Sequence, residues 1–96
     1  MSQGLTRPQI DQWLAQRPGW GYVDNEIRRQ FQFKGFRDAI AFVVQVAELA
    51  EAAGHHPDIT INYNKVLIAF TTHDAGGVTQ QDLDLAARID GLSVIS

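Results

Sequence analysis

Two short turn sequences constrain the fold of this chain more than any other feature. Asp24-Asn25 and Asn64-Lys65 each separate two segments that have the composition of β-strands. Asparagine and aspartate tolerate the positive φ angles that a tight hairpin requires. The sequence therefore predicts two antiparallel hairpins, whose strands cover residues 20–23, 26–33, 58–63 and 66–72.

Helix signals fill the rest of the chain. Thr6 starts a first helix with Gln9 in capping-box register, and a Pro-Gly pair ends it. Helices are predicted from Thr6 to Arg17, from Phe36 to Ala53, and from Thr79 to about Asp90. The order of helix, two strands, helix, two strands and helix predicts an α+β fold. In this fold, a four-stranded antiparallel sheet has its helices packed on one face.

Composition limits the classes of protein to which this chain can belong. Its 96 residues suffice for one domain, which we expect to cover residues 1–96. The absence of cysteine excludes a disulfide scaffold, a thiolate zinc site and a cysteine nucleophile. The net charge of −3 and the scattered basic residues argue against direct binding of nucleic acid. The sequence shows neither a membrane span nor a signal peptide, so a cytoplasmic protein is expected.

The long helix from Phe36 to Ala53 carries more apolar surface than one core requires. At about 100° per residue, its apolar side chains cover roughly 220° of the circumference. The polar remainder consists of Arg37, Asp38, Gln45 and Glu48. Two explanations stay open. Part of this surface lies in a subunit interface, or the helix is more enclosed within one chain than a surface helix.

Three histidines carry the clearest chemical signal. His55 and His56 follow the long helix, and His73 closes the fourth strand. Since the strands between them pair as a hairpin with arms of similar length, all three imidazoles are expected at one edge of the sheet. Histidine titrates near neutrality, so the cluster can supply both a proton donor and a proton acceptor. The alternative is a set of surface or hydrogen-bonding histidines without a catalytic role.

A metal site is the weaker alternative for the same histidines. Histidine clusters bind zinc, but adjacent histidines in an extended segment project to opposite sides. The chain has neither a cysteine nor an H-x-x-x-H spacing on a helix. We therefore expect no metal.

Three further side chains have both a structural and a functional explanation. Glu51 precedes His55 by four residues and either orients that imidazole or reaches water at the helix end. Asp82 lies three residues after Thr79, and this spacing favours a helix cap over a role in the site. Trp20 begins a strand, where packing in the core is favoured over stacking on a planar ligand.

Several motifs together resemble the signature of the pterin-4a-carbinolamine dehydratases. The resemblance covers nearly the whole chain and includes Gly19-Trp20 and the Phe31-x-Phe33 strand. Its most specific part is a His-His-Pro sequence with a third histidine 17 residues beyond His56. The other matching segments are Glu51 to Pro57, Tyr63-Asn64, Thr71 to Thr79, and Asp82.

The resemblance implies an enzyme that converts 4a-hydroxytetrahydropterin to quinonoid dihydropterin and water, in recycling of the pterin that aromatic amino acid hydroxylases use. It implies no metal or organic cofactor, and a homodimer or homotetramer. By motif position, the resemblance implies that His55 and His73 share the acid and base roles, in an order that stays open, and that His56 binds and polarises the substrate. The supporting residues implied by the match are Glu51, Pro57, Thr72, Asp82 and Trp20.

One departure and one alternative accompany this resemblance. Animal members carry an aromatic residue where this chain has Ile59. One contact of their pocket wall is therefore not expected in this chain. Some relatives lack the histidines and act as assembly or scaffolding proteins, whereas this chain retains all three. The alternative function is a non-catalytic interaction or coactivator module that uses the long helix as its interface.

Overall fold

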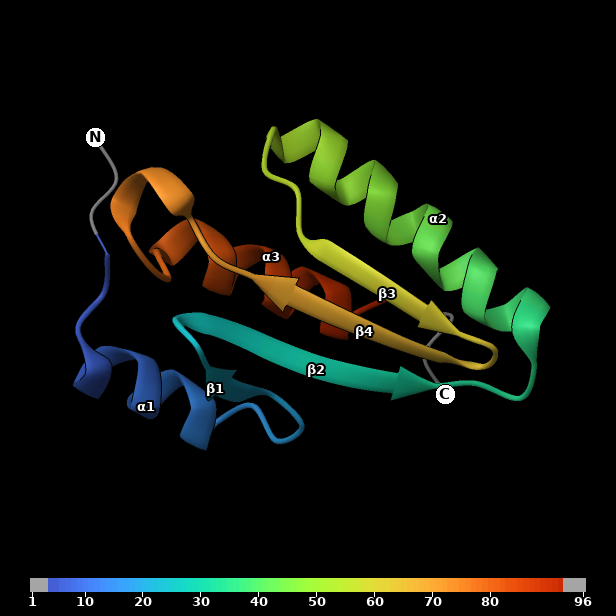
Figure 1. Cartoon of the computed structure of the whole chain (residues 1–96), viewed down its shortest axis with the longest axis horizontal. Helices are drawn as coiled ribbons and strands as arrows, with labels where there is room; N and C mark the ends of the chain where they lie inside the picture. Colours follow the sequence, from blue (N-terminus) through green and yellow to red (C-terminus); the bar gives the residue numbers. More distant parts are fainter. Residues whose placement is uncertain (1–3, 93–96) are drawn as a thin grey trace.

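A computed structural model of the chain describes residues 4–92 and shows helices packed on a four-stranded sheet (Figure 1). The elements are α1 (Arg7–Ala15), β1 (Gly21–Val23), β2 (Glu26–Gln32), α2 (Phe36–Ala53), β3 (Asp58–Asn62), β4 (Lys65–Phe70), a 3₁₀ turn η1 (His73–Ala75) and α3 (Gln80–Asp90). This order confirms the predicted α+β architecture. No helix formed by residues 4–92 is both long and apolar enough to cross a bilayer.

The strands pair antiparallel throughout, in the order β1-β2-β4-β3. The first turn occurs at Asp24-Asn25, whose φ angles of 52° and 64° lie in the left-handed region, as predicted. The second turn lies one residue earlier than predicted, at Tyr63-Asn64, because β4 already begins at Lys65. Asn64 is fixed there by Phe33. The Phe33 N–H donates to the Asn64 carbonyl at 2.8 Å, and the Asn64 amide donates to the Phe33 carbonyl at 2.9 Å.

The sheet has one buried face, and the helices cover it (Figure 1). Along β2, Ile27 and Phe31 are buried, whereas Gln30 and Gln32 are exposed on the opposite face. This alternation of buried and exposed side chains is typical of a strand with one face on a core. The core lies between the sheet and the three helices, and its largest fully buried side chains include Phe42, Phe70, Ile10, Ile27, Ile68 and Ile89.

Helix α2 buries one stripe of apolar side chains and exposes another. The buried stripe consists of Ala39, Phe42, Val46 and Ala50. On another side of the helix, Phe36 and Val44 remain 52% and 54% exposed. The core of one chain therefore uses only part of the wide apolar arc that the sequence predicts for this helix.

A polar cluster of Trp20, Arg29 and Asp90 joins the end of α3 to the first hairpin. The Trp20 indole N–H donates to the Asp90 carboxylate at 2.9 Å, and Arg29 Nη1 pairs with Asp90 Oδ1 at 2.6 Å. Trp20 is buried and packs edge-on against Trp13. Gly19 leaves room for Arg29, because a Cβ at this position would lie 3.0 Å from Arg29 Nε. Trp20 thus has the packing role that its position favours.

Truncation of Asp90 should destabilise the fold much more than truncation of an exposed aspartate. In Asp90→Ala, the Trp20 N–H and the partly buried Arg29 guanidinium both lose this acceptor. We expect the free energy of unfolding to fall by about 2–3 kcal/mol, measured by urea denaturation and circular dichroism. The matched control Asp11→Ala removes an exposed ion pair with Arg7 and should cost less than about 1 kcal/mol. Equal losses in both variants would contradict the role of the cluster.

Candidate active site

The candidate site is a cavity of about 290 Å³ where two junctions of the chain meet. One junction joins α2 to β3 and the other joins β4 to η1. Asp58 pairs with Ala69, so both junctions lie at the same end of the β3–β4 hairpin. The cavity is lined by Gly54, His55, His56, Thr71, Thr72, His73 and Asp74. All three histidines line this one cavity, which confirms the convergence predicted from the hairpin.

Gly54 ends α2 and sets the direction of the two histidines that follow. Its φ of 65° lies in the left-handed region, which glycine adopts without the steric cost of a Cβ. The His55 N–H donates to the Ala50 carbonyl at 3.1 Å, so the His55 backbone is fixed to the last helical turn. Pro57 favours extended backbone at His56, just before β3 begins. The Gly-His-His-Pro sequence thereby leads from a helix into an edge strand and keeps both imidazoles at the junction.

A tight loop after β4 places His73 at the same cavity. Thr72 and Gly77 form a bridge across this loop, and the Thr72 N–H donates to the Gly77 carbonyl at 2.9 Å. Between them, η1 makes one 3₁₀ turn that ends at Gly76, with a left-handed φ of 75°. The chain therefore reverses direction while His73, an exposed residue, stays on the cavity wall.

His55 contacts a buried aspartate of α3. Its Nε2 lies against Asp82 Oδ1, and the two side chains are 13% and 0% exposed. A carboxylate can only accept a hydrogen bond, so Nε2 carries the hydrogen in this contact. The His55 ring also stacks on Phe70, with ring centroids 6.1 Å apart and planes 11° from parallel. The Asp82 carboxylate and the Phe70 ring thus fix the position of the His55 imidazole on the cavity wall.

The Asp82 carboxylate accepts hydrogen bonds on both of its oxygens. While Oδ1 faces His55, Oδ2 accepts from the Thr72 hydroxyl and from the Thr79 backbone N–H, each at 2.8 Å. The bond from the Thr79 N–H is the helix cap that the spacing favours. The same carboxylate therefore caps α3 and contacts a cavity histidine, so the two explanations for Asp82 are compatible.

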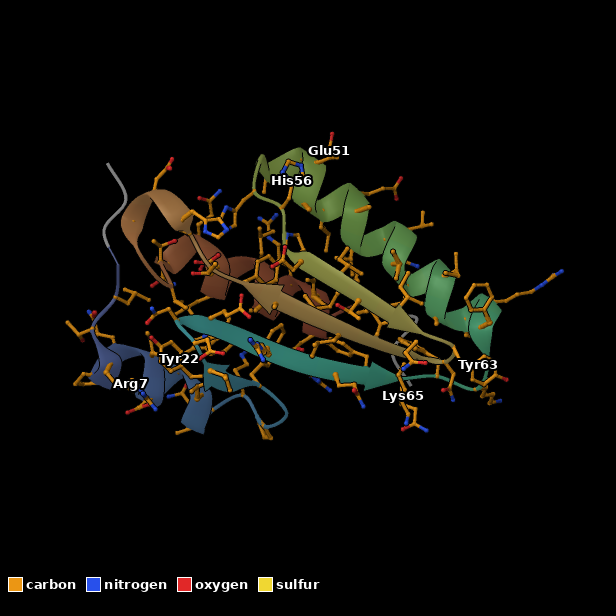
Figure 2. All side chains as sticks on the ribbon, viewed as in Figure 1. Arg7, Tyr22, Glu51, His56, Tyr63 and Lys65 are labelled. Atoms are coloured by element: carbon orange, nitrogen blue, oxygen red, sulfur yellow. The ribbon has the colours of Figure 1, made fainter. Side chains whose placement is uncertain are left out.

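Glu51 pairs with His56 and not with His55. Its Oε1 lies 2.5 Å from His56 Nε2, and the two side chains are 76% and 62% exposed. Figure 2 shows this pair at the C-terminal end of α2. Of the two explanations for Glu51, the structure therefore favours the one in which this side chain reaches water near the helix end. It does not contact His55, because successive side chains leave an extended segment on opposite sides. His55 turns toward Asp82, and His56 turns toward Glu51.

Of the predicted supporting residues, Thr72 alone lines the cavity formed by residues 4–92, while Asp82 and Glu51 contact histidines that line it. Trp20 and Pro57 neither line this cavity nor have a hydrogen bond to one of its histidines among the described residues. The Trp20 ring packs against Phe70 with centroids 6.4 Å apart, and Phe70 in turn packs on His55. Trp20 thus reaches the site through Phe70. A direct contact of Trp20 with a substrate stays a prediction.

Two threonines belong to the surroundings of the site, although the sequence did not single them out for it. Thr71 lines the cavity, and its hydroxyl donates to the Asn25 carbonyl at 2.8 Å. The buried Thr79 hydroxyl lies 2.9 Å from the Thr72 hydroxyl. The T-x-x-D spacing could have placed Thr79 near the site, because a capping box brings its first residue into contact with Asp82.

The arrangement suits proton transfer to and from a small molecule. His55 and His56 each have one ring nitrogen fixed by a carboxylate, which leaves the other to accept or donate a proton. The cavity volume of about 290 Å³ is near the lower end of the range for small-molecule sites, roughly 300–1,000 Å³. Between residues 4 and 92, no group of three or more histidine, aspartate or glutamate side chains is placed to hold a metal ion.

Comparison with known proteins places these features in a family. The family model described as pterin 4 alpha carbinolamine dehydratase matches residues 3–92. A protein of Picosynechococcus sp. with the name pterin-4-alpha-carbinolamine dehydratase is 55% identical over 92 residues. The matched region covers 96% of this chain and 100% of that protein.

Two solved structures share the fold. A transcriptional coactivator/pterin dehydratase from Brucella melitensis has a TM-score of 0.89 and 34% identity, over 97% of this chain and 99% of that one. A pterin dehydratase-like protein, described as a RuBisCO assembly factor in the alpha-carboxysome, has a TM-score of 0.64 and 26% identity, over 80% of this chain and 89% of that one. The chain belongs to the pterin-4α-carbinolamine dehydratase family, whose enzymes are hydro-lyases.

Proposed function

We propose that this chain dehydrates 4a-hydroxytetrahydropterin to quinonoid dihydropterin by histidine acid–base catalysis, in recycling of a tetrahydropterin cofactor. The reaction breaks one C–O bond, delivers one proton to the departing hydroxyl and removes one proton from the ring nitrogen system. Its products are the quinonoid dihydropterin and water, so the reaction needs one acid and one base. The observation that carries the proposal is the cavity lined by His55, His56 and His73.

We assign His55 as the base. Its Nε2–H is directed at Asp82, so the neutral ring presents the Nδ1 lone pair to a substrate. When Nδ1 accepts the ring proton, the adjacent carboxylate stabilises the imidazolium that forms, as in other aspartate–histidine pairs. The stacked Phe70 ring supports one side of the imidazole while this happens.

His73 is then the acid, and His56 binds and polarises the substrate. His73 is exposed on the cavity wall, where it can regain a proton from water after it protonates the hydroxyl. His56 is paired with Glu51 at the surface, which orients its ring toward the same cavity. Pro57, Thr72, Asp82 and Trp20 are proposed as supporting residues. The proposal requires no metal or organic cofactor and includes the expected cytoplasmic location.

Alanine at His55 or His73 should lower kcat by about 10²–10⁴-fold, because each variant removes one proton-transfer group. His56→Ala should mainly raise KM. The measurement is stopped-flow absorbance of chemically generated 4a-hydroxytetrahydropterin, with the spontaneous decay as baseline.

The matched control is Gln30→Ala, which truncates an exposed side chain on the open face of β2 and should keep the wild-type rate. Decay at the spontaneous rate with folded wild-type protein would exclude the enzyme. A wild-type rate in His55→Ala would exclude the base assigned here.

A homodimer or homotetramer formed through α2 is also part of the proposal. At about 100° per residue, Phe36, Ile40, Val44 and Ala47 fall within roughly 80° of the helix circumference. Phe36 and Val44 are exposed, so this apolar stripe is available to a second copy. Exposed apolar patches on a folded protein commonly mark interfaces, and a two-fold axis lets one stripe cover its own copy.

A charge placed in this stripe should dissociate the oligomer. Val44→Lys is expected to elute near the mass of one 10.7 kDa chain in size-exclusion chromatography with light scattering. Wild type should elute at a multiple of that mass. The matched control is Val23→Lys, which places the same charge at an exposed valine of β1 and should leave the oligomer intact. A monomeric wild type would contradict the interface.

The same stripe favours a second candidate function, a non-catalytic interaction or coactivator module. The two structural relatives carry descriptions as a coactivator and as an assembly factor. An interaction module does not need the cavity histidines, so their truncation would leave its partner binding unchanged. The kinetic measurement above therefore separates the two candidates.

A further inference from the structure

We infer that the Thr79 hydroxyl is a positioning group for the reaction. Through Thr72 and Asp82, it holds the His55 imidazole with Nε2–H toward the protein and leaves Nδ1 for the substrate. The inference rests on the function proposed above and adds a residue to its machinery. Thr79 lies outside the cavity wall formed by the described residues, so it acts through other groups and not on the substrate.

Around Asp82 Oδ2, the Thr72 and Thr79 hydroxyls make three polar contacts but have only two hydrogens to donate. The Thr79 and Thr72 hydroxyl oxygens are 2.9 Å apart, Thr72 Oγ1 lies 2.8 Å from Oδ2, and Thr79 Oγ1 lies 3.3 Å from Oδ2. Each hydroxyl has one hydrogen to donate. The two shorter contacts are both satisfied when Thr79 donates to Thr72 and Thr72 donates to Asp82. The hydroxyls therefore form a directed chain that ends on the carboxylate.

The two ends of this chain, the Thr79 hydroxyl and the Asp82 carboxylate, are shielded from water, whereas Thr72 between them is partly exposed on the cavity wall. Thr79 is 2% exposed and Asp82 is 0% exposed. A buried hydroxyl must find its partners within the protein, and hydrogen bonds in series polarise one another. Because Oδ2 is occupied by Thr72 and by the Thr79 backbone N–H, Oδ1 is the oxygen left for His55.

The hydroxyl and the backbone of Thr79 can be tested separately. The backbone N–H caps α3 by donating to Asp82 at 2.8 Å, and most substitutions retain it. Thr79→Val keeps the volume and this N–H but removes the hydroxyl. Thr79→Ser keeps the hydroxyl and serves as the matched control. Circular dichroism and thermal unfolding establish that both variants fold.

The kinetic test compares single and double variants. Thr79→Val is expected to lower kcat about tenfold with KM unchanged, and Thr79→Ser to retain the wild-type kcat. If Thr79 acts through Thr72, the double variant Thr72→Val/Thr79→Val should lose no more than Thr72→Val alone. Independent losses that multiply, or a wild-type kcat in folded Thr79→Val, would overturn the inference.

Nitrogen NMR of histidine-labelled protein separates this inference from the proposed function. Wild type should show His55 with its hydrogen on Nε2. Thr79→Val should show a mixture with the Nδ1–H tautomer, and Thr79→Ser should restore the wild-type signals. An unchanged tautomer in Thr79→Val overturns the positioning role whatever the activity. A changed tautomer in a protein without dehydratase activity supports the positioning role and refutes the proposed function.

Discussion

The buried carboxylate of Asp82 is the interaction on which both the fold and the site depend. A completely buried carboxylate is costly unless donors surround it. Its donors come from three places: His55 after α2, Thr72 after β4, and the backbone of Thr79 at the start of α3. One charge therefore joins three segments at the point where the cavity lies, and formation of the fold also orients the proposed base.

The β3–β4 hairpin supplies the second constraint. Its register pairs Asp58 with Ala69, which fixes the junction before β3 beside the junction after β4. Gly54 sets the direction in which the chain leaves α2, because its φ lies in the left-handed region. This direction determines which of the two following imidazoles faces the interior. The interior imidazole meets Asp82 and the outer one meets Glu51. Adjacent histidines thus occupy different environments and can take different roles.

The parts of the fold that depend on local chemistry could be predicted from the sequence. Thr6 and Gln9 form the capping box that their spacing predicts, and Asp24-Asn25 forms the expected turn. The partner of Glu51 could not be predicted, since it depends on a single left-handed residue after the helix. The Trp20–Asp90 contact also had no sequence signal, because 70 positions separate its two residues. The histidine roles and the extent of the domain stay predictions.

The most direct test of the Asp82–His55 pair as the centre of the proposed reaction is stopped-flow dehydration of 4a-hydroxytetrahydropterin by Asp82→Asn and by Asp84→Asn. Asp84 lies on the same helix but is exposed and bonds to Gln80. In Asp82→Asn, the neutral amide cannot stabilise an imidazolium. An amide N–H that faces His55 Nε2 also favours the tautomer with its hydrogen on Nδ1. We expect a kcat about 10²–10⁴-fold below wild type for Asp82→Asn and an unchanged kcat for Asp84→Asn. A folded Asp82→Asn with the wild-type kcat would contradict this role of the Asp82–His55 pair.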